Sequence, residues 1–198
     1  MDNVKDISKG RYTKVHHFDN KAKIAEHIKQ INLHHTFVYP GFFIQNMTDP
    51  SWKMVVLNDR NEIEFRVPCK KETQIPILNA RRDMGPVVAH IFKNRHQYMK
   101  KRINVAAEFI SFERIAEEFM KVTGRQAKVV QIPDNEFMKG KDQEIRMEML
   151  QMFKYFEEFG YYGGNNDLSE VKKMHPSIQT WEEFLRKTGW RGPEAREE

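Results

Sequence analysis

Apolar residues at helical spacing recur along the chain and predict several amphipathic helices. The predicted helices cover about 20–31, about 83–92, 111–124, roughly 141–159, and a last segment that begins at Trp181. Asp19 and Asn20 have side chains suited to cap the first helix, and Ile24 and Ile28 stand four residues apart within it. We therefore expect Ile24 and Ile28 to form its buried stripe.

The third and fifth helices carry the clearest boundary signals. Ser111 precedes the third helix as an N-cap, and Gly124 follows it as the residue that ends it. Thr180 precedes the fifth helix, which begins at Trp181, and is its expected N-cap. In the second helix Asp83 is the expected N-cap and Pro86 the residue of the first turn. Its expected buried face consists of Val87, Val88, Ile91 and Phe92.

Between these helices lie short runs with the composition of β-strands. A β-rich run from Thr36 ends at Ile44-Gln-Asn-Met, with a turn signal at Pro40-Gly41. Proline cannot donate to a ladder, so a strand should end at Pro40 or run along an edge. Residues 54–57 and 62–67 alternate polar and apolar positions, as strands of a hairpin do. Further strands are expected at about 102–106 and 128–132, and this alternation of strands with helices predicts an α/β protein.

Composition narrows the class of protein. The 198 residues are enough for one domain with a packed core, since 39% are hydrophobic and 12% aromatic. The net charge of +5 is spread among interspersed acidic and basic residues, which disfavours direct nucleic-acid binding. The single Cys69 excludes an intramolecular disulfide and agrees with a reducing compartment. We see neither an apolar run of membrane-spanning length nor a signal peptide, so a cytoplasmic protein is expected, with the nucleus as an alternative.

The first helix poses a chemical question. Lys21 would lie in its first turn, where the helix dipole is positive and an ammonium group is disfavoured. His17 stands four residues earlier, on the same face if the helix extends back that far. Either these groups are simply exposed to solvent, or something anionic or hydroxyl-bearing belongs beside them.

Ordered segments along the chain resemble the NmrA-like family, atypical relatives of the short-chain dehydrogenases. They are His17-Phe-Asp-Asn-Lys21, Tyr39-Pro-Gly-Phe-Phe-Ile-Gln-Asn46, Asp83-Met-Gly-Pro-Val-Val, Ile103-Asn-Val-Ala-Ala-Glu, the helix from Ser111, and Tyr161-Tyr-Gly-Gly. The resemblance implies the C-terminal portion of a Rossmann-like NAD(P)-binding fold, with a smaller α/β C-terminal lobe. It also implies one domain, 1–198, in which 1–50 and about 79–105 belong to the sheet and the remainder to the lobe.

The chain departs from a complete dinucleotide-binding fold. It contains neither a G-x-G-x-x-G fingerprint nor a P-loop, and its first 15 residues lack the apolar strand and glycine turn that would open such a fold. By the resemblance, the glycine-rich half that cradles the pyrophosphate would precede Met1. Cofactor binding is therefore expected to be weakened.

The resemblance also assigns roles to residues. Active enzymes of the wider superfamily use Tyr-x-x-x-Lys, whereas this chain has His17-x-x-x-Lys21. A retained lysine without the tyrosine implies nucleotide sensing rather than hydride transfer, with Lys21 on the nicotinamide ribose of NADP. The family segment beside the nicotinamide corresponds to Pro40, Gly41, Phe42, Phe43, Ile44, Gln45 and Asn46. In that interpretation Gly41 permits close backbone approach, and Phe42 or Phe43 packs on a ring.

Simpler interpretations stay open for these residues. Lys21 can be an exposed lysine, Phe42 and Phe43 can be core residues, and Asn46 can be a turn former. His34 and His35 have no partner at metal-binding spacing, so we predict no metal site. The methionines Met147, Met149 and Met152 are interpreted as packing residues or a partner groove.

Three functions compete. The first is a redox-sensing, transcription-regulating protein without dehydrogenase activity that binds NADP-type cofactors and protein partners. The second is an NAD(P)H-dependent oxidoreductase, in which Tyr39, Tyr161 or Tyr162 replaces the missing acid, although none has a lysine four residues later. The third is an interaction fragment that binds no cofactor and whose exposed sheet edge pairs with another chain.

Overall fold

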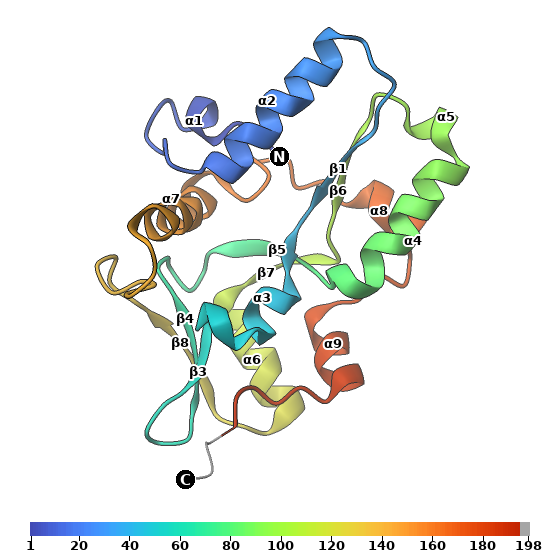
Figure 1. The fold of residues 1–198 in the computed structure, drawn as a ribbon. Coiled ribbons are helices and arrows are strands. Elements are labelled where there is room, and N and C mark those ends of the chain that lie inside the picture. Colours follow the sequence, from blue (N-terminus) through green and yellow to red (C-terminus); the bar gives the residue numbers. More distant parts are fainter. Residues whose placement is uncertain (195–198) are drawn as a thin grey trace.

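The computed structural model describes residues 1–194, in which helices and short strands alternate (Figure 1). The helices are α1 (Val4–Ile7), α2 (His16–Gln30), α3 (Ile44–Thr48), the 3₁₀ helix η1 (Pro50–Trp52), α4 (Ala80–Lys93), α5 (Arg95–Tyr98), α6 (Phe112–Thr123), α7 (Gln143–Phe159), α8 (Ser169–Met174) and α9 (Trp181–Thr188). The strands are β1 (Phe37–Pro40), β2 (Phe42–Phe43), β3 (Val55–Leu57), β4 (Ile63–Val67), β5 (Gln74–Leu78), β6 (Arg102–Val105), β7 (Glu108–Ser111) and β8 (Ala127–Gln131). The expected α/β class is confirmed. Within residues 1–194, no helix is both long enough and apolar enough to cross a membrane.

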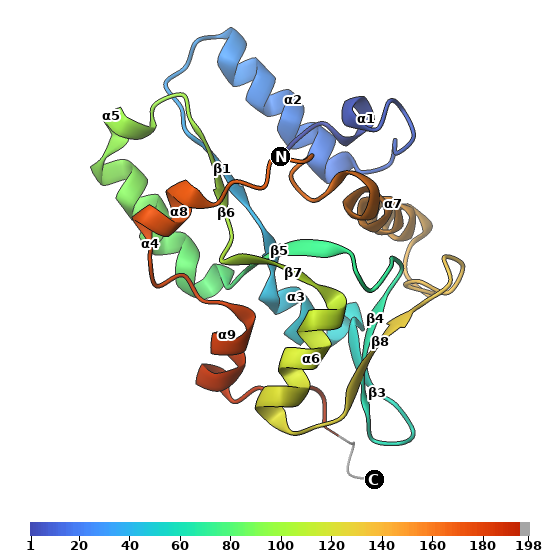
Figure 2. The ribbon, with the colours of Figure 1, turned by 180° about the vertical axis from the view of Figure 1, so that it is seen from behind.

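The strands form three small sheets. β1 and β6 pair in parallel, with Phe37 opposite Arg102. Helix α2 lies on one side of this pair, and α4 and α8 lie on the other (Figures 1 and 2). β5 lies between β2, which is parallel to it, and β7, which is antiparallel. The third sheet has the order β3-β4-β8. The chain turns at Gly41 from the first sheet into the second, and this turn is where the candidate site lies.

Several predicted elements are confirmed. The alternating segments form the antiparallel β3–β4 pair, with Val55 opposite Phe65. The hydroxyl of Ser111 accepts the backbone N–H of Arg114 at the start of α6, and Gly124 ends α6 with φ 70°. Thr180 and Glu183 form a capping box on α9. Local chemistry determines these boundaries.

The first predicted helix begins earlier than expected. α2 starts at His16, so Asp19 and Asn20 are not its N-caps. Asp19 is buried, and its carboxylate instead accepts the backbone N–H of Val4 at 2.7 Å, which caps α1. The expected stripe was also wrong, because Ile24 is 60% exposed while Ala22 and Ala25 face the core.

The second predicted helix is shifted as well. α4 begins at Ala80 after Asn79, so Asp83 and Pro86 lie inside it rather than at its start. Asp83 is fully buried, and its carboxylate bonds the His175 ring nitrogen at 2.8 Å. Phe92, expected on the buried face, is 75% exposed. The β-rich run was predicted to continue through Ile44, but residues 44–48 form α3.

Candidate functional site

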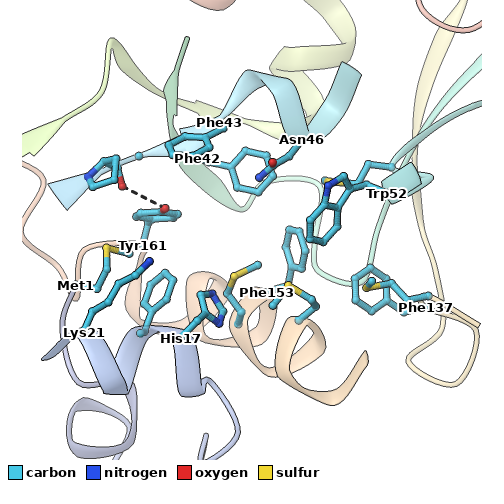
Figure 3. Close-up of a pocket in the computed structure, with 17 residues that line it drawn as sticks. Met1, His17, Lys21, Phe42, Phe43, Asn46, Trp52, Phe137, Phe153 and Tyr161 are labelled. Carbon is cyan, nitrogen blue, oxygen red and sulfur yellow. Dashed lines mark hydrogen bonds between the residues drawn. The ribbon is translucent and has the colours of Figure 1, made fainter. Parts of the chain in front are cut away.

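A cavity of about 290 Å³ opens between α2, the turn at 40–46 and α7 (Figure 3). Most of its exposed lining is apolar. Its lining residues are Met1, His17, Phe18, Lys21, Pro40, Gly41, Phe42, Phe43, Asn46, Trp52, Met54, Phe137, Met138, Met149, Met152, Phe153 and Tyr161. All the residues predicted for the cofactor except Ile44 and Gln45 therefore line one cavity.

His17 and Lys21 reach this cavity from the same face of α2, as the four-residue spacing predicts. Because α2 begins at His16, Lys21 lies in its second turn and not at the positive end of the dipole. No ion pair in the described part of the chain involves Lys21. Its ammonium group is therefore available to a bound molecule.

The anionic group beside the start of α2 belongs to the protein itself. Glu148 of α7 accepts a hydrogen bond from the backbone N–H of His17 at 2.7 Å. The same carboxylate oxygen forms a second hydrogen bond, of 2.5 Å, with Nδ1 of the His17 ring. Burial of this carboxyl group opposes ionisation, but the two hydrogen bonds from His17 outweigh it and hold the pKa of Glu148 below its ordinary value. Glu148 thus caps α2 and fixes the orientation of the His17 ring.

Gly41 is required by packing within the fold. A β-carbon at this position would overlap the carbonyl oxygen of Pro76 and would lie 3.1 Å from Cβ of Ala106. The close approach predicted for Gly41 is therefore made to the neighbouring strand β5. Close approach of a ligand to the backbone of Gly41 stays a prediction, since Gly41 also borders the cavity.

The rest of the 40–46 turn divides between core and cavity. Phe42 is buried and packs near Phe153 at 6.3 Å between ring centroids, whereas Phe43 is 37% exposed. Ile44 is fully buried. The Gln45 side chain turns to Asn79, whose Oδ1 accepts its Nε2 at 2.9 Å. Asn46 points into the cavity (Figure 3), so the two ends of the turn face the cavity and the middle anchors it.

The wall of the cavity opposite the 40–46 turn consists of residues that the sequence did not indicate as cofactor contacts. Trp52 from η1, Phe137 and Met138 from the loop before α7, and Met149 and Phe153 from α7 form it. Met149 and Met152 were interpreted as packing residues or a partner groove, and both line the cavity. The helical spacing of the α7 residues was visible in the sequence, but nothing in it placed that face opposite residues 40–46.

Tyr161 is the one tyrosine among the described residues that lines the cavity. Its hydroxyl donates to the carbonyl of Pro40 at 3.3 Å. Burial raises the pKa of the phenol above its ordinary value. Phe18 and Phe156 surround the ring, and no lysine stands four residues later to lower that pKa. Tyr161 is therefore a packed side chain whose hydroxyl has a hydrogen-bond acceptor within the fold.

The cavity joins apolar surface to two polar groups. Its aromatic rings and methionines lie beside the Lys21 ammonium and the Asn46 amide, a combination typical of small-molecule sites. In residues 1–194 no group of three His, Cys, Asp or Glu side chains is placed to hold a metal ion.

A family profile described as the NmrA-like family matches residues 1–185. The chain belongs to the NmrA-like family. The expected resemblance is confirmed.

Two similar curated proteins are fungal nitrogen metabolite repression proteins. The protein nmrA of Emericella nidulans is 29% identical over 117 residues, which cover 57% of this chain and 33% of the relative. The protein nmr of Neurospora crassa is 27% identical over 118 residues, covering 58% of this chain and 24% of the relative. A third relative, the NmrA-like family domain-containing oxidoreductase malD of Malbranchea aurantiaca, is 35% identical over 65 residues, which cover 33% of this chain and 19% of malD.

Solved structures place the fold among Rossmann-like proteins. NmrA, a negative transcriptional regulator, in complex with NAD superposes with a TM-score of 0.78 at 23% identity, covering 94% of this chain and 61% of that one. NmrA in complex with NADP gives the same TM-score at 22% identity, again covering 94% of this chain and 61% of that one. The chain thus spans less than two thirds of these relatives.

Proposed function

We propose that this chain is the part of an NmrA-like regulator that receives the nicotinamide end of NAD(P). One observation carries the proposal: α2 and the 40–46 turn bring Lys21 and Asn46 to the same apolar cavity. The structural neighbours crystallised with NAD and NADP support it. Regulation of transcription comes to the proposal from the solved NmrA, described as a negative transcriptional regulator, and from the relatives named for nitrogen metabolite repression. Redox sensing is part of the proposal because the charge of the nicotinamide ring depends on its redox state.

The two polar groups named above, Lys21 and Asn46, each have a role in this proposal. The Lys21 ammonium donates to ribose hydroxyls, and the Asn46 amide provides a donor and an acceptor for the carboxamide. The aromatic rings and methionines exclude water from the ring face. When bound, NAD(P) supplies a redox-dependent charge on its nicotinamide ring, which is the property a sensor would read.

The proposal excludes hydride transfer for two reasons. The His17 ring, at the position of the acid tyrosine, is held by Glu148 at 2.5 Å. Tyr161 has a raised pKa and an occupied hydroxyl. The chain thus lacks the acid tyrosine at the family position, and the described tyrosine at the cavity has its hydroxyl bonded within the fold.

Affinity for the whole dinucleotide is expected to be low, because the sequence contains no glycine-rich phosphate-binding motif. Calorimetric titration of NADPH into this chain should give a Kd weaker than micromolar. Binding at micromolar affinity or tighter would contradict this expectation and would place a phosphate site within the chain.

An oxidoreductase is the second candidate, favoured by the relative named as an oxidoreductase and by the Tyr161 hydroxyl at the cavity. NADPH oxidation with quinone or carbonyl substrates separates the two functions. The sensor proposal expects no turnover above background. Turnover that is lost in both His17→Ala and Tyr161→Phe would establish the enzyme instead.

A further inference from the structure

A second hollow of about 660 Å³ lies on the other side of the wall formed by Trp52, Phe137 and Met138. These three residues line both spaces. The second hollow is otherwise formed by the turn after η1, by β4 and by the segment that precedes α7. We call it the basic groove, because Lys53, Arg66, Lys139 and Lys141 line it.

The charges of the basic groove are poorly balanced. Glu136 is the one acidic residue of its lining among the described residues. None of the four basic residues takes part in an ion pair within residues 1–194. Asp49 lies near enough for Lys141 to contribute to its lowered pKa, but Asp49 owes that shift first to hydrogen bonds from Ser51. The groove therefore keeps a net positive charge.

Arg66 is the basic residue of the groove that is best placed to bond an anionic group. It lies on β4 opposite Val130 of β8, in the half-buried positions that alternate with the core residues Phe65 and Val67. Its Nε–H is buried and has no hydrogen-bond acceptor. A buried donor without an acceptor is costly, and the planar guanidinium fork matches a carboxylate or phosphate.

The apolar side of the groove suits a ring. Trp52 is 37% exposed, and Phe137 and Met138 line the groove beside it. Lys53 and Met138 adopt left-handed backbone conformations, with φ of 51° each, and Gly140 has φ 91°. The Arg146 side chain holds the second turn by bonding the carbonyls of Phe137 and Asp134 at 2.8 and 2.7 Å. The groove is thus made by two defined turns.

We propose that the basic groove binds a small organic anion that carries a carboxylate or phosphate on an aromatic body. The anionic group bonds the Arg66 guanidinium and is attracted by the three lysines, while the aromatic body packs on Trp52 and Met138. This inference goes beyond the proposed function, since it uses neither Lys21 nor Asn46.

Calorimetry at low salt with three probes that share a ring system tests the proposal: 1-naphthoate, 1-naphthyl phosphate and the neutral 1-naphthol. At least one anion should bind at least tenfold more tightly than naphthol, and the tighter anion identifies the preferred head group. Added salt should weaken anion binding, because lysine charges contribute to it. Equal binding of naphthol, or binding of neither anion, would overturn the proposal.

Arg66→Gln should weaken anion binding at least tenfold, whereas Lys93→Gln, an exposed lysine on α4, should leave it unchanged. If Arg66→Gln fails to fold by circular dichroism, the surface pair Lys139→Gln and Lys141→Gln should still lower affinity severalfold and flatten the salt dependence. Unchanged binding in a folded Arg66→Gln, or in that double variant, would refute the site. Lys21→Ala should not affect naphthoate, so failure of the basic groove and failure of the nicotinamide proposal are separate results.

Discussion

Gly41 connects the first sheet to the second at a point where no side chain fits. The obstacle is the backbone carbonyl of Pro76, which occupies the place that a β-carbon would need, so the neighbour cannot simply rotate away. Gly41→Ala should therefore lower the free energy of unfolding by about 1–3 kcal/mol, as overpacking does.

Gly85 provides the matched control for Gly41. It lies inside α4, and a β-carbon there meets no atom within 4 Å. Gly85→Ala should change the free energy of unfolding by no more than about 1 kcal/mol, because helix propensity favours alanine while Pro86 disfavours a β-carbon on the helical residue before it. Urea denaturation of both variants measures the contrast. Equal effects of the two substitutions would show that the Pro76 contact does not constrain position 41.

At the scale of elements, the contact of Glu148 with His17 joins α7 to the start of α2. The pKa of Glu148 is lowered in the folded state, so its contribution to stability is present above the pKa of an unfolded glutamate, about 4.3. That contribution is lost as the pH falls through the folded-state pKa. Glu148→Gln should therefore destabilise the protein at pH 7, and this effect should become smaller as the pH falls through the folded-state pKa of Glu148.

Urea midpoints at pH 7 and pH 3.5 measure the prediction for Glu148. Glu117→Gln is the control, because Glu117 is exposed on α6 and belongs to no ion pair in the described residues. A difference between wild type and Glu148→Gln that stays constant with pH would mean that the ionised carboxylate does not stabilise the start of α2.

Elements defined by local chemistry could be predicted from the sequence, and those defined by distant partners could not. The β3–β4 pair follows from alternation, and α6 follows from Ser111 and Gly124. The start of α2 was misplaced because Asp19 caps α1 instead of its own helix. The strand β5 was missed, since its apolar run is interrupted by Pro76.

The candidate site could be predicted only where local sequence patterns form it. Its near side follows from the His17-x-x-x-Lys21 spacing and the 40–46 segment, both local patterns. Glu148 lies 131 residues from His17, and Trp52 and Phe137 come from a turn and a loop without a recognisable motif. Gln45 was assigned to the cofactor with the whole 40–46 segment by the resemblance, and the sequence does not divide that segment into residues that face the cavity and residues that do not. Only the contact between Gln45 and Asn79 divides them.

At the scale of the whole molecule, β1 is a sheet edge that no other strand in the described residues covers. Phe37 and Gly41 donate their N–H groups toward β6, so alternation directs the backbone of Val38 to the open side. Beside it, Val38, Val88 and Phe92 border a groove of about 780 Å³. We propose that a second copy of the chain pairs with this edge.

Sedimentation velocity tests that self-association. The chain should form dimers at micromolar concentration, and Phe92→Glu should shift it to monomers by placing a charge on the exposed apolar surface. Ile145→Glu, at a 48% exposed position on α7, should leave the dimer intact. A wild-type chain that stays monomeric at high concentration would contradict the pairing.

The central claim is that the cavity holding Lys21 and Asn46 receives the nicotinamide end of NAD(P). Saturation-transfer NMR of NADPH with this chain tests it most directly, because the method detects weak binding proton by proton. We predict the strongest transfer to the nicotinamide protons, and a loss of about 1–3 kcal/mol of binding free energy in Lys21→Ala. The exposed Lys23→Ala should bind as wild type does. Stronger transfer to the adenine protons, or equal binding by Lys21→Ala and wild type, would contradict the claim.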